Sequence, residues 1–315
     1  MMQQVATVFG GSGFIGRHVV QRLARQGFIV RIAGRDTVAA AKLCTQGDVG
    51  QVVPVAASVT NEASVARAVA GASVVVNLVG ILFERKPGDF QRIQAEGAGR
   101  VARLAAAAGV RKLVHISAIG ADPGSQSHYA RSKAAGEKAV LEAFPGATIL
   151  RPSVVFGAED QFFNRFAGLA AVLPFMPVVE GQTRFQPVYV GDVADAVMAA
   201  IARDDAAGRV FELGGPRVMT MRDVLGFVLE HTHRRRMMVP LPRALVAIQA
   251  RLGEFLPTPP LTRDQLILLA RDNVVAANAA GLEALGIAPK AAEAVVPAYL
   301  ARYRRGGARQ TVFGR

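Results

Sequence analysis

The stretch Val5-Ala-Thr-Val-Phe-Gly-Gly-Ser-Gly-Phe-Ile-Gly16 decides how the chain begins to fold. Its apolar, β-branched start predicts a strand, and the amphipathic residues from Ile15 to Gln26 predict a helix. Between them, Gly10, Gly13 and Gly16 permit a tight turn, a close approach to a pyrophosphate and close helix packing. Free N–H groups and the helix dipole favour an anion there. The segment therefore predicts a dinucleotide-binding turn.

Strand and helix patterns alternate along the first half of the chain, as expected for βαβ units and a parallel sheet. The clearest helices are predicted over Ile15–Gln26, Phe90–Ala108 and Ser132–Ala143. Six strands are predicted: Val5–Phe9, Ile29–Ala33, Val52–Ala56, Val74–Val79, Leu113–Ser117 and Thr148–Arg151. We predict an α/β fold, a Rossmann-type doubly wound parallel sheet with a smaller, interleaved C-terminal α+β domain.

The alternation loosens after Pro152, where prolines become frequent. Pro187–Val190 and Val210–Leu213 still have strand character, on either side of a helix predicted over Asp192–Ala202. We expect residues 1–152 and about 185–213 to form the dinucleotide-binding domain. Residues of about 153–184 and 214–302 would form the smaller substrate or partner domain, and residues 303–315 a mobile basic tail.

Composition limits the class of protein. Of 315 residues, 51% are hydrophobic and 19% charged, which excludes disorder for most of the chain. The single Cys44 excludes an internal disulfide and a Cys-based zinc site. The start carries no basic leader, and the longest apolar run, Val74–Phe83, is too short to span a membrane. We therefore expect a cytoplasmic protein, attracted to anionic surfaces by its net charge of +13.

The end of the second predicted strand indicates which coenzyme is preferred. An acidic residue there binds a free ribose 2′-hydroxyl, whereas an arginine accommodates a 2′-phosphate. Here the strand ends in Gly34-Arg35, and Asp36 stands two positions past the expected acidic residue, where it is expected to cap the next helix. We predict NADPH or NADP in preference to NAD, with Arg35 at the 2′-phosphate.

Ser117, Tyr129 and Lys133 form a constellation with catalytic character. Tyr129 and Lys133 share one helix face at i and i+4. The pKa of a tyrosine is ordinarily about 10, and it must fall to roughly 7 for the phenol to exchange protons at neutral pH. A neighbouring ammonium supplies part of that decrease. Ser117, at the end of the fifth strand, would hold a substrate oxygen beside the tyrosine hydroxyl.

Other candidate sites are weaker. His115 on its buried strand is expected to be a packing residue, and Asp192 an N-cap. The cluster His231-Thr-His-Arg-Arg-Arg236 has no carboxylate or thiol beside its histidines, so it predicts no metal site. It is better interpreted as a solvated helix end or a contact to an acidic partner. No nucleic-acid binding is expected, because interleaved aromatic residues are lacking.

Over nearly its whole length the sequence resembles an extended or atypical short-chain dehydrogenase/reductase. Four phrases are similar to the family of nucleotide-binding accessory subunits of respiratory complex I, subunit nine of its alpha subcomplex, and its bacterial relatives. They are Asn77-Leu-Val-Gly80, His115-Ile-Ser-Ala-Ile-Gly-Ala-Asp122, Tyr129-Ala-Arg-Ser-Lys-Ala-Ala-Gly-Glu137 and Arg151-Pro-Ser-Val-Val-Phe-Gly-Ala-Glu-Asp160.

The resemblance implies NADPH as a tightly bound structural ligand. The pyrophosphate would lie at the glycine turn, Lys133 would bind the nicotinamide ribose beside Ser117 and Tyr129, and Arg35 would bind the 2′-phosphate. The implied cofactor-binding residues are Gly10, Ser12, Gly13, Phe14, Ile15, Gly16, Arg35, Asn77, Leu78, Val79, Gly80, Ser117, Tyr129, Lys133, Pro152, Ser153 and Val154. One departure is Ser58, where many relatives have an aspartate that holds the adenine amine.

Two functions remain open at this stage. The first is an NADPH-binding accessory or assembly subunit of NADH:quinone oxidoreductase, whose partners would be complex I subunits and the cytoplasmic face of the inner membrane. The second is an active NADPH-dependent oxidoreductase, epimerase or dehydratase that uses Ser117, Tyr129 and Lys133 on an unidentified small substrate. A soluble redox sensor is a weaker third interpretation.

Overall fold

The computed structural model describes residues 4–253 and 261–306, and the chain divides into two compact units. The first unit comprises residues 1–152, 190–213 and 276–288, and the second comprises residues 153–189, 214–275 and 289–315. The sequence predicts that the first domain resumes at about residue 185 and ends at residue 213. In the structure, the first unit resumes at Val190 and also includes Ala276–Ala288. This last segment has no strand pattern from which its place in the first unit could be predicted.

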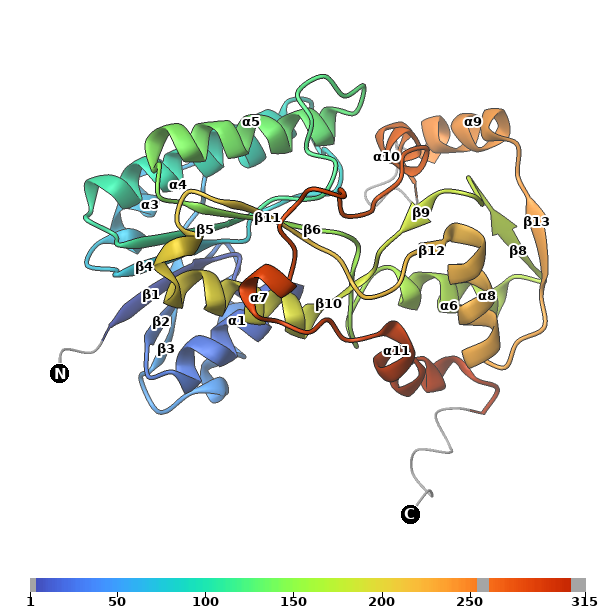
Figure 1. Ribbon diagram of the computed structural model, residues 1–315, viewed down its shortest axis with the longest axis horizontal. Coiled ribbons are helices and arrows are strands. Elements are labelled where there is room, and N and C mark those ends of the chain that lie inside the picture. The colour runs from blue at the N-terminus through green and yellow to red at the C-terminus, as the bar shows by residue number, and fades with distance from the viewer. Residues whose placement is uncertain (1–3, 254–260, 307–315) are drawn as a thin grey trace, which may run out of the picture. The chain divides into compact units, whose positions relative to one another are not determined.

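A seven-stranded parallel sheet forms the centre of the first unit, in the order β11-β6-β5-β4-β1-β2-β3 (Figure 1). Its strands are β1 (Val5–Phe9), β2 (Ile29–Gly34), β3 (Val52–Ala56), β4 (Val74–Asn77), β5 (Lys112–Ile116), β6 (Thr148–Pro152) and β11 (Val210–Leu213). The predicted doubly wound α/β fold is therefore confirmed. Because β1 is paired on both sides, by β2 and by β4, the ends of these three strands lie together.

Helices cover both faces of the sheet. In Figure 1, α3, α4 and α5 lie on one face and α1 and α7 on the other. The bounds are α1 (Phe14–Arg25), α2 (Thr37–Ala41), α3 (Glu62–Val69), α4 (Glu96–Ala107), α5 (His128–Ala143) and α7 (Val190–Ala202). Short 3-10 helices span Cys44–Gln46, Asp204–Ala206 and Glu283–Leu285. Alanine and valine fill the core between α3, α4, α5 and the sheet, as a chain without tryptophan requires.

Two local predictions need correction. The helix predicted over Phe90–Ala108 begins as a π-helix, Phe90–Ala95, and becomes α-helical only from Glu96. Asp192 is not an N-cap, because α7 already begins at Val190 and Asp192 lies buried in its first turn. The apolar pattern correctly located both helices, but it does not register an inserted residue or the exact start of a buried helix.

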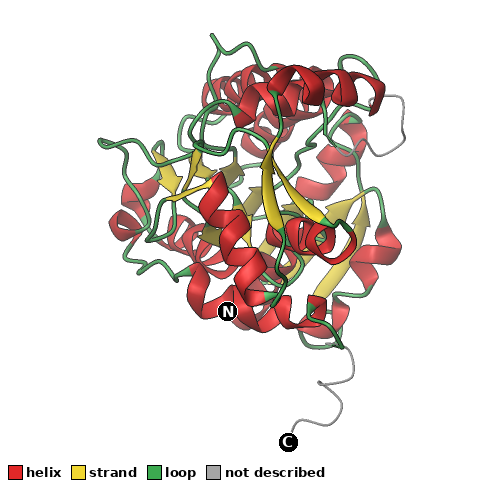
Figure 2. Ribbon diagram, turned by 90° about the vertical axis from the view of Figure 1, so that its right-hand side faces the viewer, coloured by secondary structure: helices red, strands yellow, loops and turns green. Residues whose placement is uncertain are grey.

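The second unit combines short paired strands with helices, drawn in yellow and red in Figure 2. Its pairs are β7 with β10 (parallel), β9 with β12 (antiparallel) and β8 with β13 (parallel). The strands are β7 (Val155–Phe156), β8 (Phe175–Val178), β9 (Arg184–Phe185), β10 (Val188–Tyr189), β12 (Met219–Thr220) and β13 (Met237–Pro240). The helices are α6 (Phe163–Val172), α8 (Met221–His231), α9 (Arg243–Gly253), α10 (Arg263–Leu269), α11 (Ala292–Leu300) and a 3-10 turn, Ala301–Tyr303.

The strand expected over Pro187–Val190 is only the two residues of β10, and it pairs with β7 and not with the seven-stranded sheet. The chain turns directly into α7 after Tyr189, which leaves no room for a longer strand. Asp160 organises the start of α6: its carboxylate accepts the backbone N–H groups of Gly157, Phe162 and Asn164.

The start of the expected basic tail is held in place. The backbone carbonyl of Tyr303 accepts two bonds from Arg234, and Arg304 donates to the carbonyl of His231. The remainder of that prediction, residues 307–315, lies outside the described residues. Within residues 4–253 and 261–306, no helix combines the length and the apolar character needed to cross a membrane.

A glycine substitution tests the packing of α5 on the π-helix. A Cβ at Gly136 would lie 2.4 Å from the carbonyl oxygen of Gln94, so Gly136→Ala must displace one helix. We expect a loss of about 1–3 kcal/mol in the free energy of unfolding, measured by urea denaturation. Gly168→Ala in α6 is the control, because a Cβ there meets nothing within 4 Å. It should gain up to about 1 kcal/mol from helix propensity, and equal effects of the two changes would contradict the packing argument.

Candidate functional site

The glycine turn joins β1 to α1 by direct backbone contact. Gly10 has a φ of 75°, a left-handed conformation that favours glycine. A Cβ at Gly16 would lie 2.4 Å from the carbonyl oxygen of Gly10, so only glycine allows the helix to start this close to the turn. Ser12 lies in the turn and Phe14 and Ile15 in the first turn of α1, all partly exposed.

The start of α1 is suited to a phosphate. Its N-cap, Gly13, contributes no side-chain hydrogen bond, and no acidic residue occupies the first turn. Gly13 is exposed, and a Cβ there would approach only the carbonyl oxygen of Gly10, at 3.2 Å. The first N–H groups of a helix have no partners within it, so this end presents donors and a positive dipole to an anion. The turn therefore fits the pyrophosphate of a dinucleotide.

The end of β2 lies against this turn, because the N–H of Gly10 donates to the carbonyl of Ala33 at 3.0 Å. Arg35 follows two residues later and is exposed. Asp36 caps α2, as expected: its Oδ1 accepts the N–H of Ala39 at 2.9 Å. That carboxylate is therefore engaged in a local cap, whereas the guanidinium beside the turn is exposed to solvent.

The loop after β4 lies on the other side of the turn. The N–H of Leu78 donates to the carbonyl of Phe9, and a Cβ at Gly10 would come within 3.4 Å of the backbone of Leu78 and Val79. Further along, a Cβ at Gly80 would lie 3.3 Å from the ammonium of Lys133. The segment 77–80 thus connects the glycine turn to α5.

Tyr129 and Lys133 lie on one face of α5, as predicted from their spacing. Ser127 caps this helix by accepting the N–H of Ala130. The Lys133 ammonium lies 6.0 Å from the centre of the Tyr129 ring, and that ring packs edge-on against Phe90. Tyr129 and Lys133 are therefore adjacent, with the cation over the ring face.

Lys133 is deeply buried, and its ammonium donates to the carbonyl of Ile116 at 3.3 Å. Burial lowers the pKa of Lys133 to about 8, although Glu137 acts in the opposite direction. Ser117 follows Ile116 directly. Its hydroxyl is buried and has no hydrogen-bond partner within the described part of the chain. A buried hydroxyl without a partner costs free energy unless a ligand oxygen or water satisfies it.

His115 and Asn77 form a buried pair that the sequence reasoning did not identify. They stand opposite each other in the β4–β5 register, and the amide nitrogen of Asn77 lies 3.2 Å from Nδ1 of His115. Because the Asn77 oxygen accepts the N–H of Val79, the amide nitrogen must face the ring. The imidazole therefore accepts at Nδ1 and helps to fix the loop beside the glycine turn. Two polar residues at the same level of adjacent strands were the available signal.

Gln94 is a second residue that the sequence reasoning missed. It is buried in the π-helix, where its side-chain oxygen accepts the N–H of Ile81 at 3.3 Å and its nitrogen donates to Ser132 at 2.9 Å. A Cβ at Gly80 would lie 3.4 Å from that oxygen. Gln94 thus joins the loop after β4 to the helix that carries Tyr129 and Lys133. The available sequence signal was a glutamine at the apolar i, i+4 spacing between Phe90 and Ala98.

The last predicted contacts are divided between the two units. Pro152 ends β6 in the first unit, where its carbonyl accepts the N–H of Ile119. Ser153 and Val154 belong to the second unit. There the Ser153 hydroxyl bonds to Asn273, whose side-chain oxygen also accepts the N–H of Val154.

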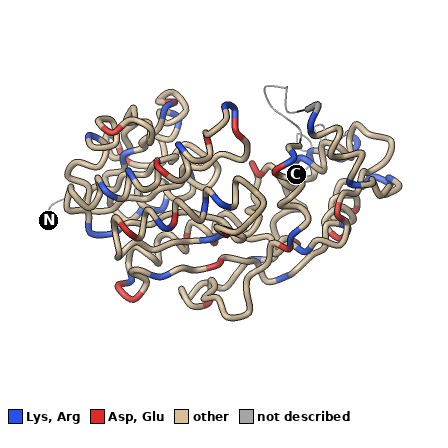
Figure 3. The backbone as a smooth tube through the Cα atoms, turned by 90° about the horizontal axis from the view of Figure 1, so that it is seen from above, with Lys and Arg blue, Asp and Glu red and all other residues tan. Residues whose placement is uncertain are grey.

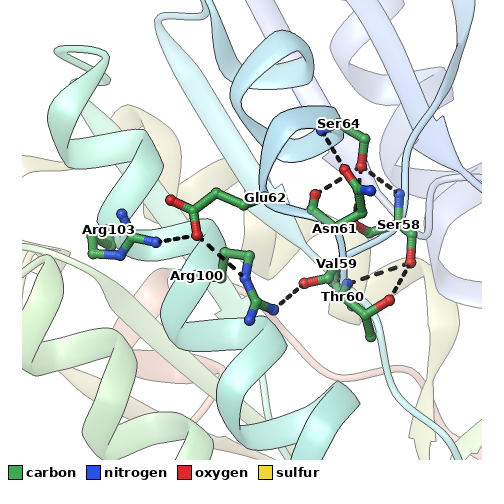
Figure 4. A network of polar contacts seen from close by, with 8 residues as sticks. All are labelled: Ser58, Val59, Thr60, Asn61, Glu62, Ser64, Arg100 and Arg103. Carbon is green, nitrogen blue, oxygen red and sulfur yellow. Dashed lines mark hydrogen bonds and ion pairs between the residues drawn. The ribbon is translucent and has the colours of Figure 1, made fainter.

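Ser58, in the position where an aspartate is common, belongs to a local network after β3 (Figure 4). Its hydroxyl lies 2.8 Å from that of Thr60, and its N–H donates to Ser64. Asn61 caps α3 through the N–H of Ser64, and Arg100 of α4 donates to the carbonyl of Val59. The serine and threonine hydroxyls here stabilise the turn, and they offer no negatively charged acceptor for the amine of an adenine base.

The chain belongs to the NAD dependent epimerase/dehydratase family, whose sequence model matches residues 6–214. It is 35% identical to "NADH dehydrogenase [ubiquinone] 1 alpha subcomplex subunit 9, mitochondrial" of Arabidopsis thaliana, over 96% of this chain and 79% of that protein. The protein of the same name from Rattus norvegicus is 36% identical, over 95% of this chain and 80% of that protein. The crystal structure of UDP-glucose 4-epimerase from Thermotoga maritima is 20% identical, with a TM-score of 0.69 over 98% of this chain and all of that one.

The buried imidazole predicts acid sensitivity. Burial and the Lys133 cation lower the pKa of His115 to about 3. The unfolded chain, with a histidine pKa near 6.5, therefore binds the extra proton first, and stability falls as the pH drops from 6.5 toward 3. Between pH 7 and pH 4.5, protonation linked to this residue should lower the free energy of unfolding by about 2–3 kcal/mol. His115→Gln should remove this part of the pH dependence, as measured by urea unfolding at each pH. A variant whose free energy of unfolding varies with pH as in the wild type would contradict the prediction.

Proposed function

We propose that this protein is an NADPH-binding accessory or assembly subunit of respiratory NADH:quinone oxidoreductase, in which the nucleotide is a structural ligand. The observation that carries the proposal is the start of α1, which has no side-chain cap and no acidic residue in its first turn. The exposed Arg35 lies near it, because the N–H of Gly10 donates to the carbonyl of Ala33, two residues before Arg35. The 31–36% identity to complex I subunits over at least 90% of the chain supports the choice of partner.

NADPH is favoured over NADH by the two charged residues after β2. Asp36 is engaged in the cap of α2, where its Oδ1 accepts the N–H of Ala39. Arg35 would form a charge-assisted hydrogen bond with a 2′-phosphate. Lys133, buried next to Gly80, would bind the nicotinamide ribose, with Ser117 and Tyr129 beside it. The remaining residues of the site are those of the glycine turn, the segment 77–80 and residues 152–154.

The partners in this proposal are subunits of complex I, and the location is the cytoplasmic face of the inner membrane. A formal charge of +13 favours attachment to acidic subunits and to anionic headgroups. A tightly held dinucleotide would contribute to the stability of the first unit, because a ligand that binds only the folded state shifts the folding equilibrium.

Identification of the nucleotide tests the cofactor. Denaturation of the purified protein should release NADPH or NADP⁺ in about equimolar amount, measured by chromatography and mass spectrometry. Arg35→Glu should weaken NADPH binding by about tenfold to hundredfold, by loss of a charge-assisted bond, and leave NADH nearly unchanged in calorimetry. Arg25→Glu, an exposed arginine at the far end of α1, is the matched control. Equal losses for both coenzymes would overturn the assignment to NADPH.

An active oxidoreductase is the second candidate, because Tyr129, Lys133 and the unpartnered Ser117 hydroxyl lie in one region. When bound, the coenzyme would supply or accept a hydride. Ser117 would polarise the substrate oxygen, Tyr129 would move a proton to or from it, and the Lys133 ammonium would favour the ionised phenol.

Native separation of respiratory membranes distinguishes the two candidates. For a structural role, the wild type and Tyr129→Phe should migrate with complex I in equal amounts, whereas Gly13→Asp, which places a negative charge at the phosphate position, should lose most of the association. A wild-type chain that never migrates with complex I would refute the accessory role. A Tyr129→Phe variant that migrates normally but reproduces the phenotype of a deletion would favour the enzyme.

A further inference from the structure

One surface of the second unit combines clustered arginines with exposed apolar side chains, and we call it the arginine–apolar face. It comes from the end of α6, the start of β8, the turn between α8 and β13, the start of β13, and the residues after α11. Its members are Val172, Phe175, Arg234, Arg235, Arg236, Met237, Arg304 and Arg305. Figure 3 marks arginine and lysine together in blue along the backbone.

Strand pairing and hydrogen bonds make this face continuous. Met237 of β13 stands directly opposite Phe175 of β8 in a parallel pair. The preceding Arg236 donates to the carbonyl of Ala170 in the last turns of α6, which brings it beside Val172. Arg234 bonds to the carbonyl of Tyr303, and this attaches the segment that carries Arg304 and Arg305.

Backbone carbonyls hold three of the five arginines in place. Arg234, Arg236 and Arg304 donate to backbone carbonyls, and within residues 4–253 and 261–306 none of the five forms an ion pair. Burial and the nearby cations of Arg236 and Arg305 lower the pKa of Arg234. Helix-end carbonyls thus orient cations that repel one another, and an external anion would relieve that repulsion.

The apolar members of the face are exposed to solvent. Val172 is 82%, Met237 74% and Phe175 38% exposed. Cations alone would suit any polyanion, but large aliphatic side chains beside them suit the boundary between headgroups and acyl chains. Nucleic acid would be better served by several stacking aromatic rings, of which this face has one.

We propose that the arginine–apolar face binds the surface of an anionic phospholipid bilayer. The arginines contact lipid phosphates, and Val172, Phe175 and Met237 enter the outer edge of the acyl region. This deepens the peripheral location proposed above, but it requires neither a nucleotide nor complex I.

The experiment is sedimentation of the full-length protein with vesicles of phosphatidylcholine, with or without phosphatidylglycerol. We expect binding only when phosphatidylglycerol is present, and loss of binding at high salt. Arg235→Glu with Arg305→Glu changes two exposed side chains outside the backbone bonds described above, and should lower the partition coefficient by about hundredfold. Arg25→Glu with Arg67→Glu makes the same change in net charge in the first unit and should retain binding.

A second pair of changes tests the apolar contribution. Val172→Ser with Met237→Ser keeps every charge and should lower vesicle binding by about tenfold, with thermal unfolding unchanged because both side chains are exposed. If this pair has no effect while polyglutamate binds the protein as well as vesicles do, the face recognises an acidic polypeptide and the lipid proposal is overturned.

Two further outcomes would also overturn the proposal. One is a wild-type protein that does not sediment with phosphatidylglycerol vesicles. The other is binding that survives every change on the face and is lost with Leu245→Ser and Ile248→Ser, on the exposed apolar side of α9. Because no step depends on the coenzyme, either failure would leave nucleotide release and migration with complex I intact as tests of the proposed function.

Discussion

The close backbone contact between the glycine turn and the first turn of α1 is the constraint on which the first unit depends. A methyl group at Gly16 would lie within 2.6 Å of three backbone atoms of Gly10 and Gly11, so the helix and the turn can meet only without it. Since β1 is paired with both β2 and β4, this contact also fixes where Arg35 and Asn77 emerge. One local packing requirement thereby sets the geometry of the start of α1 and of the loops on either side of it.

Burial of Lys133 links this scaffold to the candidate chemistry. Removing an ammonium from water is costly, and the single carbonyl of Ile116 compensates for only part of that cost, which is why the pKa of Lys133 falls to about 8. The same cation contributes to the low pKa of His115, which stays neutral and braces Asn77. The polar cluster beneath the turn is therefore held by buried hydrogen bonds, from Asn77 to His115 and from Lys133 to the carbonyl of Ile116.

Much of the first unit follows from sequence because its signals are local. Six strands were located within two residues, since each is a short β-branched run between turn residues, and the spacing of Tyr129 and Lys133 was sufficient to place them on one helix face. The role of Gln94 and the pairing of His115 with Asn77 were not predicted, because they depend on partners distant in sequence. Gln94 contacts Ile81 and Ser132, and His115 contacts Asn77. The return of Ala276–Ala288 to the first unit has the same cause, as it rests on hydrogen bonds to Glu212.

The π-helical turn at Phe90–Ala95 imposes a rule on chain length. A π-turn holds one residue more than an α-turn, so a single deletion there would rotate the chain on one side by about 100° relative to the other. The side chains facing β4 and those facing α5 would then exchange neighbours, and Gly97, which has no room for a Cβ beside Val59, would no longer meet that residue. Gaps between natural homologues should therefore accumulate in the preceding loop, residues 82–89, and spare these six positions.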